Sequence, residues 1–139
     1  MWIHEHAVET AVRRDLVWQA LADIDNWTAW DTSMQEIKLT GPFEVGGTVA
    51  MTPIGQDPIV STIVEIVEGR SYADETSFGG VTLRFSHTLE DVADGTRIVH
   101  RLEITGDAAD ELGPEIGPQI TEDFPEAMTG LITYAGSLG

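Results

Sequence analysis

The chain has 139 residues and a formal net charge of −17 at pH 7, because 24 acidic residues face only 7 lysines and arginines. This balance excludes the clustered basic residues that hold nucleic acid or an anionic membrane surface, so we expect neither partner. The chain has no cysteine, which excludes thiol catalysis and cysteine-ligated zinc. Its length and its 42% of hydrophobic residues predict one domain over residues 1–139 with a core of its own.

The first elements are a strand and two short helices. Residues 2–10 alternate between the two faces of a strand. Apolar residues then fall at helical spacing over 13–23 and predict an amphipathic helix. Asp25-Asn26 predicts the cap of a second short helix, which carries Trp27 and Trp30.

Six further strands follow, separated by turn residues. They are predicted over 34–40, 48–52, 59–67, 70–77, 81–92 and 96–105. Asp94-Gly95, between the last two, is typical of a hairpin turn. Consecutive strands with short connections indicate an antiparallel meander.

The last part of the chain is predicted to be helical. Residues 107–112 form one short piece, which Gly113-Pro114 and Gly117-Pro118 are expected to interrupt. Residues 119–138 carry one apolar stripe and predict a long helix, with a kink at Pro125. Because the sheet needs a cover for its apolar face, we expect it to curl around this helix.

Several short motifs accompany these elements. They are Val17-Trp18, Trp27-Thr28-Ala29-Trp30-Asp31, Gly41-Pro42-Phe43, Met51-Thr52-Pro53-Ile54-Gly55, Asp74-Glu75-Thr76, Phe85-Ser86-His87-Thr88-Leu89-Glu90 and Gly95-Thr96-Arg97. Together with the order of elements, they resemble the START-like (SRPBCC) superfamily, and within it the bacterial polyketide cyclase/dehydrase-like group.

The resemblance implies a helix-grip fold of the α+β class. In it, a seven-stranded antiparallel curved sheet surrounds a long C-terminal helix, and two short helices follow the first strand. The first strand is then expected to pair with the seventh, and the seventh with the sixth. The resemblance also implies a cavity between sheet and helix that holds an apolar small molecule.

Three histidines are the first candidates for chemistry. Strand parity places His6, His87 and His100 on the inward face of strands that the resemblance makes neighbours. Three interpretations stay open: hydrogen-bonded structural residues, acid–base or ligand-binding groups, and a three-histidine metal site that depends on strand register. We assign His87 and His100 as candidate catalytic groups and His6 as a ligand contact, and predict no metal.

Asp74 is the second candidate. If Tyr72 points inward, Asp74 does so too, and a carboxyl group in an apolar cavity has a raised pKa suited to acid–base chemistry. Tyr72 would assist it. The alternative is a solvated position at the sheet edge.

Large apolar side chains are expected on the cavity wall, where ligand contact and ordinary core packing are both possible. The candidates for ligand binding are Trp27, Trp30, Met51, Phe85, Phe124 and Met128.

The sequence therefore predicts a protein that binds an apolar or aromatic, polyketide- or lipid-like small molecule. The first alternative is a cofactor-free cyclase or dehydratase, and the second is an interaction module with a vestigial cavity. No cofactor is implied, and a monomer or homodimer is expected. Without a secretion signal or an apolar span, we expect a cytoplasmic location.

Overall fold

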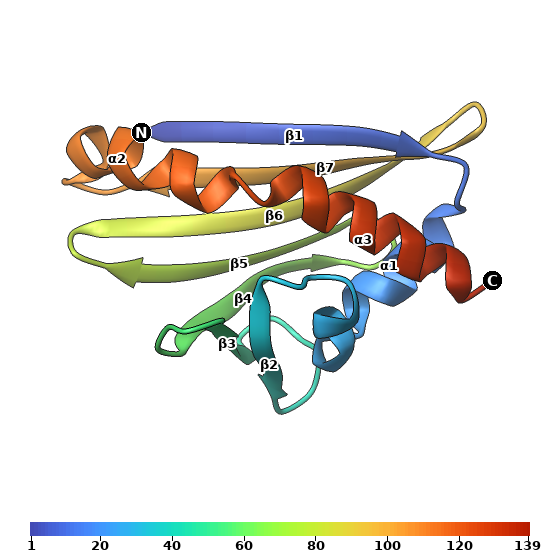
Figure 1. Ribbon diagram of the computed structural model, residues 1–139, viewed down its shortest axis with the longest axis horizontal. Coiled ribbons are helices and arrows are strands. Elements are labelled where there is room, and N and C mark those ends of the chain that lie inside the picture. Colours follow the sequence, from blue (N-terminus) through green and yellow to red (C-terminus); the bar gives the residue numbers. More distant parts are fainter.

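Seven antiparallel strands form one curved sheet in the order β1-β7-β6-β5-β4-β3-β2, as Figure 1 shows. The computed structural model describes residues 1–139. The strands are β1 (Trp2–Thr10), β2 (Met34–Thr40), β3 (Thr48–Pro53), β4 (Ile59–Val67), β5 (Ser71–Phe78), β6 (Val81–Val92) and β7 (Gly95–Thr105). The helix-grip α+β fold is confirmed, including the pairing of β1 with β7 and of β7 with β6.

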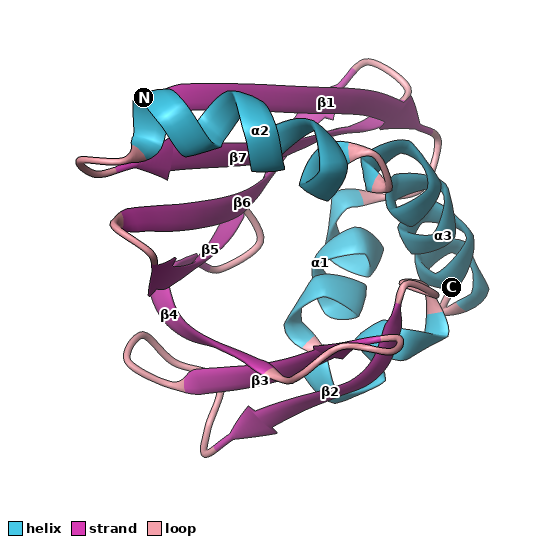
Figure 2. Cartoon of the chain, turned by 60° about the vertical axis from the view of Figure 1, so that its left-hand side comes forward, coloured by secondary structure: helices cyan, strands magenta, loops and turns pink.

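Four helical segments lie at the concave side and at one end of the sheet. They are α1 (Arg14–Ala22), the 3₁₀ helix η1 (Ile24–Ala29), α2 (Ala109–Thr121) and α3 (Phe124–Ser137). Figure 2 shows that the sheet is strongly curved, that α2 lies along β1 and β7, and that α1 lies beside α3. No helix is both long enough and apolar enough to cross a bilayer.

The C-terminal segment differs from the prediction of one long helix over 119–138. The chain instead forms α2 and α3, which are separated at Glu122-Asp123. Pro125 lies in the first turn of α3, where backbone N–H groups have no partner within the helix, so the lack of an N–H on proline costs no hydrogen bond. The proline therefore starts a helix, and the predicted interior kink was wrong.

The predicted interruptions at Gly113-Pro114 and Gly117-Pro118 were also wrong, because α2 runs through both. The carbonyl groups four residues before each proline lose a helical partner, but they belong to exposed residues, which are accessible to water. The glycines allow close packing: a Cβ at Gly113 would lie 2.5 Å from Cβ of Trp2, and one at Gly117 would lie 2.6 Å from its ring.

The start of η1 also differs from the prediction. Asp25-Asn26 does not cap it, since the helix begins at Ile24 and its preceding residue is Asp23. Asn26 Nδ2 donates to Asp23 Oδ2 at 2.8 Å. Asp25 Oδ1 instead accepts the backbone N–H of Leu39 at 3.0 Å, so this carboxylate joins η1 to β2.

The buried core is divided into two clusters. Sixteen residues around α1, η1 and α3 form the larger one, in which Val17, Leu21 and Leu131 are fully buried. Six residues under α2 form the smaller one, which includes Leu102 and Phe124. The cavity described below is lined by members of both clusters, so it lies where the core is divided.

Gly130 sets how closely α3 approaches η1, and its replacement tests this contact. A Cβ at Gly130 would collide with the backbone carbonyl oxygen of Trp30. We expect Gly130→Ala to lower the free energy of unfolding in urea by about 1–3 kcal/mol, although alanine is the better helix former.

The matched control is Gly136→Ala in the same helix. Its Cβ would meet Val12 Cγ2 at an ordinary 3.6 Å. This variant is expected to be neutral or more stable by about 0.5 kcal/mol. Equal stabilities of the two variants would contradict the close approach of α3 to Trp30.

Candidate functional site

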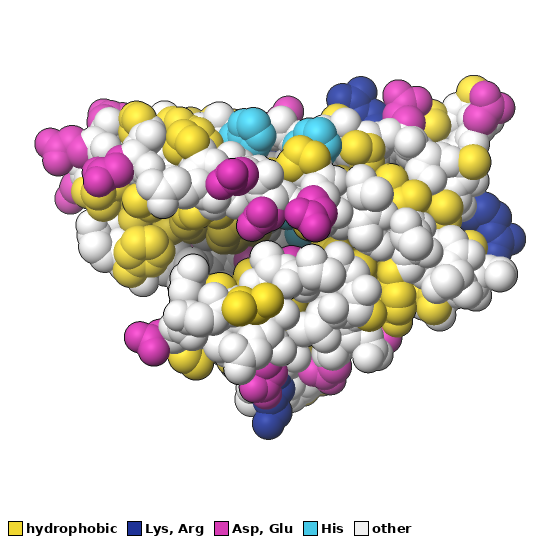
Figure 3. All heavy atoms as spheres, viewed as in Figure 1, with side chains coloured by type: hydrophobic (Ala, Val, Ile, Leu, Met, Phe, Trp, Pro, Cys, Tyr) yellow, Lys and Arg dark blue, Asp and Glu magenta, His cyan; other side chains and the backbone are white.

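A cavity of about 680 Å³ lies between the concave face of the sheet and the helices. Twenty-five residues line it, and 13 of them are hydrophobic. They come from η1, from α2 and α3, from six of the strands and from the connecting loops. Figure 3 shows the surface hollowed between the helices and the β2–β3 part, with hydrophobic side chains in the hollow and acidic ones along it.

Eight of the predicted site residues line this cavity. They are Trp27, Trp30, Met51, Asp74, Phe85, His87, His100 and Phe124. Tyr72 and Met128 do not line it, because both are fully buried in the larger core cluster. His6 is half-buried on β1 and also lies outside the lining.

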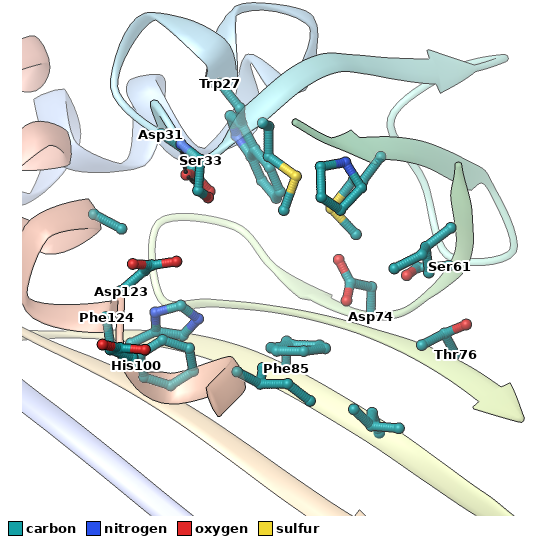
Figure 4. Close-up of a pocket in the computed structure, with 18 of the residues that line it drawn as sticks. Trp27, Asp31, Ser33, Ser61, Asp74, Thr76, Phe85, His100, Asp123 and Phe124 are labelled. Atoms are coloured by element: carbon teal, nitrogen blue, oxygen red, sulfur yellow. Dashed lines mark hydrogen bonds between the residues drawn. The ribbon is translucent and has the colours of Figure 1, made fainter. Parts of the chain in front are cut away.

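Asp74 and Tyr72 form a buried hydrogen-bonded pair. The Tyr72 hydroxyl donates to Asp74 Oδ2 at 2.8 Å, while Oδ1 of Asp74 is buried without a partner. Figure 4 shows the carboxyl group pointing into the cavity. Burial raises the pKa of Asp74 to about 7, and Glu75 adds to this, although the Tyr72 hydrogen bond acts in the opposite direction. At neutral pH the group therefore exists in both protonation states.

The Tyr72 hydroxyl keeps its proton throughout this range. Burial raises the pKa of Tyr72, and the adjacent Asp74 carboxylate raises it further. Tyr72 therefore acts on the cavity only through Asp74, whose second oxygen it holds in place.

The three inward histidines lie at one level along the strands, because His6 pairs with His100 and His100 with His87. In this structure no three His, Asp or Glu side chains are grouped so that they could hold a metal ion. The rings of His87 and His100 instead stack with centroids 3.9 Å apart and planes at 24°.

Phe124 extends this stack from α3. Its ring lies 3.9 Å from that of His100, with 12° between the planes. Burial lowers the pKa of His87 to about 4. Burial, and then the neighbouring histidines, also lower the pKa of His100. Both imidazoles are therefore neutral at pH 7, so each offers one N–H donor and one acceptor nitrogen.

Ser61 lines the cavity, although the sequence analysis did not single it out. Ser61 Oγ and Trp30 Nε1 are buried without a partner, as are Asp74 Oδ1, both ring nitrogens of His87 and Nδ1 of His100. The alternation of residues along β4 could have predicted that Ser61 faces inward, since it shares a face of the strand with Ile59 and Ile63. Buried polar groups are normally paired, so these atoms are free to accept or donate hydrogen bonds to a molecule in the cavity.

Carboxylates are the charged groups of the entrance. Glu122 and Asp123 are exposed at the junction of α2 and α3, and Asp31 follows η1. Asp31 Oδ1 accepts hydrogen bonds from the N–H and hydroxyl groups of Ser33. No lysine or arginine is among the residues that line the cavity.

A curved antiparallel sheet that grips helices around such a cavity defines a protein of the START-like class. The chain belongs to the family described as polyketide cyclase / dehydrase and lipid transport, whose model matches residues 1–136. This match confirms the resemblance drawn from the motifs. No curated protein matches the chain in sequence.

Solved structures with the same fold share little sequence with the chain. Ara h 8.0201 has a TM-score of 0.79 and 17% identity, and 97% of each chain is covered. A START superfamily protein from Mycobacterium smegmatis has a TM-score of 0.77, 10% identity and 99% coverage of both chains. The ZhuI aromatase/cyclase from Streptomyces sp. R1128 has a TM-score of 0.73 and 15% identity over 96% of this chain and 93% of that chain. These similarities show the fold alone.

Proposed function

We propose that the protein binds an apolar or aromatic small molecule in the cavity between the sheet and the helices. The proposal rests on the composition of the cavity wall. A mostly apolar cavity of about 680 Å³ contains buried polar atoms without partners. This combination is typical of ligand pockets, in which apolar walls supply affinity and a few polar groups fix orientation.

Aromatic side chains favour a flat ligand. Trp27, Trp30, Phe85 and Phe124 all line the cavity. The rings of Trp27 and Trp30 lie 5.6 Å apart at 54°, so they present a tilted aromatic wall. Aromatic pairs gain free energy beyond simple burial of area when their rings meet offset or edge to face. The family description, which includes lipid transport, also supports an apolar ligand.

Uptake of a neutral fluorescent dye tests this proposal. Phenylnaphthylamine emits strongly only in apolar surroundings, and we expect it to bind saturably to the wild-type protein. Phe85→Trp adds volume to the cavity wall and is expected to weaken dye binding by about tenfold, because the enlarged side chain occupies ligand space.

Phe43→Trp is the matched control, because Phe43 packs on the core outside the cavity lining. Its dye affinity is expected to stay close to that of the wild type. Absence of saturable uptake, or equal weakening by the two substitutions, would argue against the cavity as the binding site.

A cofactor-free cyclase or dehydratase is the second candidate, and the Asp74–Tyr72 pair favours it. A carboxyl group with a pKa of about 7 and one free oxygen in the cavity is suited to moving a proton near neutral pH. Neutral His87 and His100 would orient the substrate. Loss of water from a bound poly-ketone, detected by mass spectrometry and abolished by Asp74→Asn, would support this activity.

A further inference from the structure

We propose that the ligand of this cavity is a hydrophobic amine, and that its ammonium group binds the free oxygen of Asp74. The inference rests on the proposed binding function and specifies the chemical class of the ligand. It also predicts that ligands with a carboxylate, such as fatty acids, bind poorly.

The charges around the cavity are the first argument. None of the lining side chains is a lysine or an arginine, and the two buried imidazoles are neutral at pH 7. A carboxylate ligand would therefore be buried without a cationic partner, which is strongly unfavourable. Its charge would also face Asp74, and the entrance carboxylates Asp31, Glu122 and Asp123.

Asp74 supplies the second argument, since its side chain is built to receive a cation. The residue is only 2% exposed, and Oδ1 has no hydrogen-bond partner. Oδ2 already accepts the Tyr72 hydroxyl at 2.8 Å, which fixes the plane of the carboxyl group. Figure 4 shows this group, which comes from β5, directed into the cavity. An ammonium group there would form a charge-assisted hydrogen bond and compensate the buried negative charge.

The aromatic walls supply the third argument. Trp27, Trp30 and Phe85 line the same cavity, and the faces of aromatic rings attract cations. The net charge of −17 also raises the concentration of cations near the entrance. Walls, buried carboxyl group and entrance thus all favour the same ligand charge.

Three probes with one aromatic body and different charge test the proposal: naphthylethylamine, naphthylethanol and naphthylacetate. Their affinities are measured by calorimetry at neutral pH. We expect the wild-type protein to bind the amine about tenfold more tightly than the alcohol, because hydrogen bonds to a charged donor are about twice as strong. Naphthylacetate is expected to bind most weakly.

Asp74→Asn keeps the size of the side chain and an oxygen that accepts the Tyr72 hydroxyl, so it is expected to fold. It should lower the affinity for the amine about tenfold while changing that for the alcohol less than about threefold. Asp94→Asn is the control, since it removes the same charge from an exposed turn between β6 and β7. It should change none of the three affinities.

The outcomes separate this inference from the function on which it rests. Equal affinities for amine and alcohol, tightest binding of naphthylacetate, or an amine preference that survives Asp74→Asn would overturn the assignment and leave apolar binding standing. Failure of all three probes to bind, together with failure of phenylnaphthylamine uptake, would overturn the binding function itself.

Discussion

Replacing Trp27 with alanine is expected to lower the free energy of unfolding by about 4 kcal/mol, which is typical of a buried tryptophan. Trp27 is 5% exposed, and its ring contacts those of Trp30, Tyr72 and His87 at centroid distances of 5.5 to 6.2 Å. Its Nε1 also donates to the Leu21 carbonyl oxygen at 2.9 Å. The substitution therefore leaves a void beside the cavity and a buried carbonyl group without its partner.

Trp18→Ala is the matched control, because Trp18 is half-buried and the one aromatic ring it contacts is that of Phe43. We expect this variant to lose about 2 kcal/mol in the same urea titration. A loss at Trp27 no greater than that at Trp18 would show that the Trp27 ring does not hold η1 against the sheet.

The second large effect is a dependence of stability on pH that originates at Asp74. Its pKa is about 7 in the folded chain and 3.8 when unperturbed. Between these values the folded state binds more protons than the unfolded state, so the contribution of Asp74 to stability falls as the pH rises. A shift of this size corresponds to about 4 kcal/mol. Since asparagine does not titrate, the stability of Asp74→Asn relative to wild type should increase by up to that amount across this range.

The test uses the difference in free energy of unfolding between wild type and Asp74→Asn, because His87 changes the stability of both proteins with pH in the opposite direction. Its pKa falls from 6.5 to about 4 on folding, so its contribution to stability is lost as the pH falls through that interval. His100 acts in the same sense as His87. Unfolding curves of wild type and Asp74→Asn at several pH values isolate Asp74. A difference that stays constant with pH would contradict the buried carboxyl group.

Strand parity accounts for most of the candidate site residues that the sequence placed on the inner face of the sheet and that line the cavity. From Val81 to Leu89, β6 carries an apolar or aromatic residue at every second position, so Phe85 and His87 were assigned to the inner face, and both line the cavity. The same reasoning placed Asp74. Parity assigns a side chain to a face, and these strands are long and regular enough for that assignment to hold.

Parity does not tell whether an inward side chain lies in the packed core or at the cavity, and for this reason some predicted residues fall outside the cavity lining. Tyr72 and Asp74 share a face, yet Tyr72 is buried in the core and only Asp74 lines the cavity. Whether Met128 on α3 meets the cavity or the core depends on how α3 lies against η1. Contacts between residues far apart in the sequence, such as that of Gly130 with Trp30, set this position.

Contacts with distant parts of the chain also explain why the prediction for α2 was wrong. Gly113 and Gly117 are helix breakers by local propensity, but their role is to admit Trp2 from the other end of the chain. Because Trp2 lies outside residues 107–121, the sequence pattern of that segment could not predict this contact. The hydrogen bond from Tyr72 to Asp74 was equally outside the reach of periodicity, because it depends on side-chain conformation.

The open sheet has a consequence for the behaviour of the protein in solution. Its two outer strands, β1 and β2, each pair on one side only, and unpaired strand edges invite pairing with another molecule. Glu5 and Glu9 on β1, and Glu36 on β2, are exposed. Together with the net charge they make two edges repel each other. This protection weakens near the isoelectric point of about 4.2, so acid should favour edge-to-edge aggregation even while the fold is intact.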